Sequence, residues 1–357
     1  MPAQPLCHPL IVLISVFVST LTCAHCEEHV EFLIGDRMES EGGHWQPADS
    51  PVNRPFGVDF DTSGNMYLVE LEGGRVFRMD TKRQLTQISG DGSKGYTGDG
   101  GVAGDATYNG MHNCAVTPAG DLFISDSWNH CIRRIDLKTG LVSTIAGTGK
   151  KGFGGDQGPA TDATFDYLMC ISLSHDDSLI HITDLSNRRI REMNLKTGMV
   201  RTVAGNGQKG VPTDGAMAVS SPFVDPRAAV ADSQGRLYVL ERGGHALRVV
   251  ETDGTIRTVA GTGKKGFADG PALSAQLNAP KHICVDPQDN VYIADDENAA
   301  IRKYDPVTRT LSTLLGRGFG DKQIQLSHPH GVCVQGDWLY VCDSSNNRVL
   351  RIQLATR

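Results

Sequence analysis

Short apolar segments bounded by turn-forming residues recur along the chain in groups of four. In the fifth group the segments are 282–286, 290–295, 300–305 and 310–316, and the intervening turns contain Pro, Asp or Asn. Runs of this length between such turns are typical of β-strands. The pattern therefore predicts a series of units, each built from four short strands.

The acid that closes the second strand of each group marks the repeat. It recurs at intervals of 48 to 58 residues, as Glu70, Asp126, Asp184, Glu241, Asp295 and Asp343. A period of this size with several strands per unit indicates a propeller, because one unit cannot bury its faces alone. We predict one all-β domain over residues 29–354, a six-bladed β-propeller of four-stranded antiparallel blades.

The fourth strands show how the ring closes. Five of them are followed by a long Gly-rich crossing loop, and they lie at 84–90, 141–147, 199–205, 255–261 and 310–316. The sixth group ends near Leu354 without room for another strand. Residues 29–35 have the same strand-then-Gly form, so we predict that this N-terminal strand completes the last blade.

The turn after the second strand carries the motif WNHCIRR at 128–134, with related stretches at 186–191, 297–302 and 346–349. With these motifs the chain resembles the NHL-repeat family, which forms six-bladed propellers. Residues 72–74 and 242–244 depart from the pattern. The resemblance implies the fold and says little about chemistry, because propellers host enzymes, scaffolds and receptors.

Composition and the N-terminus narrow the function classes. The chain has 357 residues and a formal net charge of −7 without a Lys/Arg-rich run, which argues against nucleic-acid binding. Residues 10–21 are largely apolar and small residues follow at 22–24, so residues 1–24 are interpreted as a signal peptide. We expect an exported protein (periplasmic, cell-surface or extracellular) without a membrane span in the mature chain.

The six strand-closing acids, Glu70, Asp126, Asp184, Glu241, Asp295 and Asp343, could be read as a ring of carboxylates for a metal or for acid–base chemistry. A feature present in every unit usually maintains the unit. In four units an Asn follows three residues later, and an Asp in that position can accept hydrogen bonds from the turn's amides. We therefore predict that these acids are structural.

Function is better sought where the units differ. Alignment places six residues at the start of the inner strands, around one mouth of the channel: Phe56, His112, Met169, Arg227, Lys281 and His330. The next residues include Asn113, Cys170 and His282. We predict a cationic mouth that binds a carboxylate, a sulfate or an acidic sugar, with Arg227 as a bidentate fork and Lys281 as a point charge. The candidate ligand-binding residues are His112, Arg227, Lys281, His282 and His330.

A metal site is the alternative. His112, His282 and His330 could hold a divalent ion through neutral imidazoles. The chain also resembles amidating lyases in fold, and that resemblance implies zinc held by His at inner-strand starts. Here Met169 and Arg227 replace such ligands, and the cations Arg227 and Lys281 oppose a bound metal. Lactonase-type propellers imply a calcium site of Glu, Asn and Asp, which cannot be assigned here.

The sequence contains no evident nucleophile motif. We therefore predict a non-catalytic binding module without a cofactor, whose partner at one rim is a protein, a glycan or a small anionic ligand. A metal-dependent lyase or hydrolase with zinc or calcium is the competing hypothesis.

Overall fold

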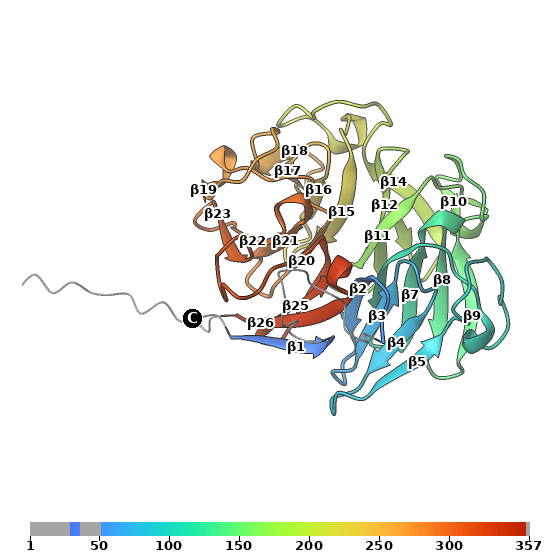
Figure 1. The fold of residues 1–357 in the computed structure, drawn as a ribbon. Coiled ribbons are helices and arrows are strands. Elements are labelled where there is room, and N and C mark those ends of the chain that lie inside the picture. Colours follow the sequence, from blue (N-terminus) through green and yellow to red (C-terminus); the bar gives the residue numbers. More distant parts are fainter. Residues whose placement is uncertain (1–28, 36–50, 355–357) are drawn as a thin grey trace, which may run out of the picture.

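Six antiparallel sheets follow one another around a ring in the computed structural model, which describes residues 29–35 and 51–354 (Figure 1). Each inner strand contacts the inner strands of both neighbouring sheets, and β2 of the first sheet contacts β24 of the last. The ring is therefore closed, as predicted. The predicted signal peptide lies outside the described residues.

The blades run from inner to outer strand in chain order. Blade one contains β2 (Pro55–Phe60), β3 (Met66–Glu70), β4 (Val76–Met79) and β5 (Leu85–Ser89). Blade two contains β6 (Met111–Val116), β7 (Asp121–Asp126), β8 (Cys131–Asp136) and β9 (Leu141–Ala146). Blade three contains β11 (Leu168–Leu173), β12 (Leu179–Asp184), β13 (Arg189–Asn194) and β14 (Met199–Ala204).

Blade four contains β15 (Pro226–Ala231), β16 (Leu237–Glu241), β17 (Ala246–Val250) and β18 (Ile256–Ala260). Blade five contains β20 (His282–Val285), β21 (Val291–Asp295), β22 (Ala300–Asp305) and β23 (Thr310–Leu315). Blade six contains β24 (Pro329–Gln335), β25 (Trp338–Asp343), β26 (Arg348–Gln353) and, as its outer strand, β1 (Val30–Ile34).

The N-terminal strand completes the last blade, which confirms the predicted closure. β1 pairs antiparallel with β26, with Val30 opposite Ile352 and Phe32 opposite Leu350. The carboxylate of Glu31 accepts hydrogen bonds from Arg351 on the same sheet and from Arg83 on blade one. Blade six is therefore built from both ends of the described chain.

Crossing loops carry elements that the sequence pattern did not predict. The two-residue strands β10 (Gly158–Pro159) and β19 (Gly270–Pro271) add a fifth strand to the outer edges of blades three and five. Short 3₁₀ helices lie in four crossings, at η1 (Ala103–Asp105), η3 (Ala160–Asp162), η4 (Ala218–Ser220) and η5 (Ala272–Ser274). Three more follow second strands, at η2 (Ser127–Asn129), η6 (Asp296–Asn298) and η7 (Ser344–Asn346).

The apolar core is divided among the seams between neighbouring blades. Most side chains of each buried cluster come from two adjacent sheets, for example Tyr67 and Val69 of blade one with Met111 and Leu122 of blade two. The same arrangement recurs at the other seams. No single blade encloses a core of its own, which is the physical basis of the repeat.

A glycine ends each fourth strand where the chain turns into the crossing loop. At Gly147 the backbone is left-handed (φ +90°), and a β-carbon there would collide with the carbonyl oxygen of His130. Only glycine accommodates both constraints. Within the described residues, no helix has the length and apolar character needed to cross a bilayer.

Candidate ligand site at the channel mouth

The structure brings together most of the residues that begin the inner strands. The ring of Phe56 stacks on His330 at 3.6 Å between centroids and meets His112 edge-on at 5.1 Å. The centroids of His112 and His330 are 6.1 Å apart. Side chains from blades one, two and six therefore converge at one end of the channel.

Arg227 of blade four joins this group as a buried cation. It is 4% exposed, and its Nη2 donates to Nε2 of His330 at 3.1 Å. Its Nε and Nη1 are buried and have no hydrogen-bond partner among the described residues. No ion pair of Arg227 is present in the described part of the chain.

The other buried arginines make the contrast clear. Each of them reaches at least one carboxylate, and they are Arg133, Arg191, Arg248, Arg302 and Arg348. A buried cation is normally paired, because removing it from water is costly. Within residues 29–35 and 51–354, Arg227 is the buried arginine without such a partner.

The protonation states make this a site with one positive charge. Burial and the nearby Arg242 lower the pKa of Arg227 to about 10, so the guanidinium remains charged at neutral pH. Burial and the charge of Arg227 hold the pKa values of His112 and His330 well below the usual range. Both imidazoles are therefore neutral near pH 7.

Backbone carbonyls determine the tautomers of these two histidines. Nδ1 of His330 donates to the carbonyl of Phe56 at 2.9 Å, and Nδ1 of His112 donates to the carbonyl of Gly110 at 2.8 Å. A carbonyl only accepts, so Nδ1 carries the hydrogen and Nε2 keeps its lone pair. Nε2 of His330 is held by Arg227, whereas Nε2 of His112 has no hydrogen-bond partner in the described structure.

His282 lies one residue further along its strand and belongs to a separate polar layer. Its Nε2 is 2.8 Å from Nδ2 of Asn113, and its Nδ1 is 3.3 Å from the amide nitrogen of Val332. A neutral imidazole accepts at one of these two nitrogens. Burial and the charge of Arg227 lower the pKa of His282 to about 3. His282 is therefore a neutral packing partner of Asn113, with its ring 5.8 Å from that of His330.

Lys281 differs from the expected free point charge. Its Nζ lies 3.0 Å from Oδ2 of Asp296, a buried residue that also contacts Nδ1 of His328 at 3.2 Å. The side chain of Lys281 is 23% exposed. Lys281 therefore carries its own counter-ion, whereas Arg227 has none among the described residues.

The three predicted metal candidates do not fit a zinc site in this arrangement. Nε2 of His282 is engaged by Asn113 and Nε2 of His330 by the cation Arg227. Among the described residues, the group of three potential ligands whose donor atoms lie within 4.8 Å of one another is instead Asp296, Glu297 and His328. Lys281 already pairs with Asp296 there.

The six strand-closing acids are fully buried and bridge parts of their own blades. Asp126 shows the arrangement: it accepts from the amide of Asn109 at 2.7 Å and from the side chain of Asn129, with Arg133 3.5 Å away. Burial raises the pKa of Asp126 to about 6 against these contacts. We call this set of contacts the acid cluster of a blade.

The acid clusters share a bond that differs from the predicted one. The amide bound by each carboxylate belongs to the end of the crossing loop before the inner strand, rather than to the turn that follows the acid. The donors are Asn53, Asn109, Asp166, Val224, Asn278 and Ser327. Each acid thus joins the second strand to the entrance of the first.

The chain is similar in sequence to NHL-repeat proteins. A model described as "NHL repeat" matches residues 326–352. NHL repeat-containing protein 2 of Bos taurus is 25% identical over 347 residues, covering 86% of this chain and 47% of the relative. Protein SUPPRESSOR OF QUENCHING 1, chloroplastic, of Arabidopsis thaliana is 26% identical, covering 86% of this chain and 31% of the relative. The chain thus spans about half or less of these relatives.

Solved structures share the fold at low identity. An auxiliary nutrient binding protein from Bacteroides ovatus superposes with a TM-score of 0.66 at 14% identity, covering 91% of this chain and 76% of that one. A streptogramin B lyase superposes with a TM-score of 0.55 at 15% identity, covering 92% and 98%. At such identities the likeness concerns the architecture alone, which supports a binder and an enzyme equally.

Proposed function

Because the chain is an NHL-repeat protein folded as a six-bladed propeller, we propose that it is a non-catalytic binding module with an anion site at the channel mouth. The ligand is a carboxylate, such as an acidic sugar, and Arg227 is its anchor. Phe56 and His112 frame the site from blades one and two, respectively.

The unpaired guanidinium of Arg227 carries this proposal. Two of its nitrogens have no acceptor among the described residues, and its charge has no counter-ion there. An unsatisfied buried donor costs about 1–3 kcal/mol, and more when the group is charged. A carboxylate that accepts a charge-assisted hydrogen bond from one of these nitrogens offsets this cost, because such bonds are stronger than those between neutral groups. The site thus favours an anion over a neutral ligand or a metal ion.

Anion-dependent thermal unfolding tests the proposal. We expect glucuronate to raise the unfolding midpoint of the wild-type protein and glucose to have no effect, since a ligand of the folded state stabilises it by mass action. Arg227→Gln should abolish the response. The same variant should unfold at the wild-type temperature or above without ligand, because it removes an unpaired buried charge.

Arg201→Gln is the matched control, because Arg201 lies on the outer edge of blade three and pairs with Glu192 on the surface. It should keep the full response to glucuronate. A wild-type protein that responds to neither glucuronate nor sulfate, or an Arg227→Gln protein that responds as strongly as wild type, would contradict the proposal.

A metal-dependent lyase or hydrolase is the second candidate. His112 favours it, because its Nδ1 is oriented by the carbonyl of Gly110 and its Nε2 stays free among the described residues. In metal-binding histidines, a hydrogen bond from the ring nitrogen that does not bind the metal orients the ring in the same way. Metal analysis of the purified protein separates the two functions: one zinc or calcium ion per chain, lost in His112→Ala, would favour the enzyme.

We also propose that the protein is exported, on the basis of the apolar segment 10–21 and the small residues that follow it. Recovery of a chain that begins near residue 25 outside the cytoplasm would support export. An intact N-terminus on a protein retained in the cytoplasm would contradict it.

A further inference from the structure

We propose that the seam between blades four and five holds a second ligand site, which binds a small organic carboxylate with an apolar body. The site is a pocket of about 550 Å³, separate from the channel mouth. Cavities of this size commonly hold small molecules. It is lined by Arg257, Thr258, Val259, Pro271, Ala272, Leu273, Tyr304 and Arg309.

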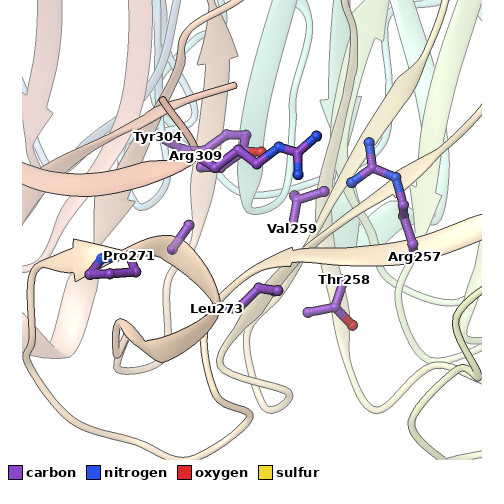
Figure 2. A pocket seen from close by; sticks show the side chains of 8 residues that line it. Arg257, Thr258, Val259, Pro271, Leu273, Tyr304 and Arg309 are labelled. Atoms are coloured by element: carbon purple, nitrogen blue, oxygen red, sulfur yellow. The ribbon is translucent and has the colours of Figure 1, made fainter. Parts of the chain in front are cut away.

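Two guanidinium groups face each other across this pocket (Figure 2). Arg257 extends from β18 of blade four, and its Nε donates to Glu251 at 2.7 Å, which leaves its terminal nitrogens for other acceptors. Arg309 extends from the β22–β23 turn of blade five and forms no ion pair within the described residues. Arg257 keeps Glu251 as a counter-ion, whereas Arg309 has none among the described residues. An anion between the two guanidinium groups is therefore attracted by the uncompensated charge of Arg309 and can accept hydrogen bonds from both.

Tyr304 adds a hydrogen-bond donor to the same pocket. It is 4% exposed, and its hydroxyl has no hydrogen-bond partner in the described structure. Burial raises the pKa of Tyr304, although Arg257 and Arg309 act in the opposite direction, so the hydroxyl stays protonated. A carboxylate held by the two arginines can accept from this hydroxyl.

The repeat shows that Arg309 is not the residue that the fold prefers at its position. In blades two to five, one residue of the turn between the third and fourth strands has a left-handed backbone, and its carbonyl accepts from the first amide of the neighbouring 3₁₀ helix. This residue is Gly140, Gly198 or Gly254 in blades two to four, and Arg309 (φ +55°) in blade five. Blade one also keeps an arginine with a left-handed backbone in its outer hairpin, Arg83 (φ +65°), and that side chain pairs with Glu31. A side chain kept in this conformation therefore serves a contact in blade one, and we infer a contact for Arg309 as well.

Tyr304 departs from the repeat in the same blade. It pairs with the outer strand at a position where the neighbouring blades have apolar side chains without a polar group, and these are Ile135, Met193 and Val250. The seam between blades three and four provides the comparison: Arg201 replaces Arg257, but Val250 and Gly254 replace Tyr304 and Arg309. The full set of polar groups therefore occurs at one of these equivalent seams.

The remaining lining determines the kind of anion. Val259, Ala272 and Pro271 present apolar surface beside the two arginines, and Leu273 is 63% exposed. Covering this apolar surface is favourable for a ligand with a hydrocarbon or aromatic body. A hydrated inorganic anion gains nothing from it, so the pocket favours an amphipathic carboxylate.

Calorimetric titration with benzoate, benzamide and inorganic phosphate tests this assignment. We expect benzoate to bind at one site, and benzamide and phosphate to bind at least about tenfold more weakly, since one lacks the charge and the other the apolar body. Arg309→Gly and Tyr304→Phe should each weaken benzoate binding by about tenfold. Arg309→Gly should fold at least as stably as wild type, because glycine is the residue that three other blades use there.

Two controls separate this pocket from the channel mouth. Arg201→Gln, at the equivalent strand position one blade earlier, and Arg227→Gln should both leave benzoate affinity unchanged. Wild-type affinity for benzoate in folded Arg309→Gly would overturn the proposal, as would equal binding of phosphate and benzoate. Loss of benzoate binding in Arg227→Gln alone would also overturn it, because the ligand would then occupy the channel.

Discussion

A chain that begins at residue 36 is expected to unfold about 10 °C below one that begins at residue 25, because it lacks the strand that closes the ring. β1 supplies the outer strand of blade six, and Phe32, Leu33 and Ile34 pack into two adjacent core clusters. Full burial of such a side chain contributes about 1.5–3 kcal/mol; Ile34 is buried and Phe32 and Leu33 are partly buried, so the loss amounts to about 4–6 kcal/mol. For a domain of this size, each kcal/mol shifts the midpoint by about 2 °C.

The same truncation exposes the backbone edge of β26. Unpaired strand edges template association with other chains, so the truncated protein should also aggregate at lower concentration than the longer one. Thermal unfolding followed by circular dichroism, together with light scattering, measures both effects.

Glu31→Ala in the longer chain is the control for the truncation. It removes the ion pairs with Arg83 and Arg351 but keeps the strand, and partly exposed pairs of this kind contribute about 0–1 kcal/mol. Its midpoint should therefore stay within about 2 °C of the parent. Equal midpoints for the chains that begin at residues 25 and 36 would show that the ring is stable without β1.

The sequence was sufficient to predict the ring because its period reports directly on the blades. Each strand is a short apolar segment between turn residues, and each fourth strand ends in a glycine that the backbone requires, as at Gly147. Missing and surplus strands could then be counted, which placed residues 29–35 in blade six. The two-residue strands β10 and β19 were not predicted, because two residues are too few to show a periodic pattern.

The candidate site could be predicted only in part, because its residues converge from blades far apart in the sequence. Alignment of the repeats identified Arg227 and His330, which lie 103 residues apart and are hydrogen bonded. It could not show that Lys281 pairs with Asp296, since Asp296 lies in a turn that varies between blades. Burial, which makes the histidines neutral, is likewise a property of the assembled channel.

The pocket between blades four and five could not be predicted from the sequence, although two of its residues differ from the repeat. Arg309 stands where three other repeats have glycine, and Tyr304 stands where the other blades have apolar residues without a polar group. Each substitution is ordinary by itself, because surface turns tolerate change. Their significance depends on Arg257, which belongs to the preceding blade and reaches the same pocket only in the folded ring.

Asp343→Ala is expected to lower the free energy of unfolding by about 3–5 kcal/mol, the range found when one partner of a buried ion pair is removed. Asp343 is the carboxylate at the centre of the acid cluster of blade six. It accepts from the amide of Ser327 at 2.7 Å, from Asn346, and from Nε of Arg348 at 2.7 Å. Arg348 is itself buried, and within the described residues its other acceptor is the carbonyl of Gln325. Alanine therefore leaves a buried guanidinium without a counter-ion, and the Ser327 amide without its acceptor.

The double variant Asp343→Ala/Arg348→Met tests whether the unpaired charge causes the loss. It should recover much of the stability, because a buried ion pair replaced by apolar side chains of similar volume is often tolerated. Chemical denaturation of the two single variants and the double variant gives the coupling energy. A single Asp343→Ala variant as stable as wild type would mean that the acid cluster does not hold blade six. Arg227→Gln should instead leave the free energy of unfolding unchanged or raise it. Arg227 has no counter-ion among the described residues, whereas Asp343→Ala takes the counter-ion of Arg348 away.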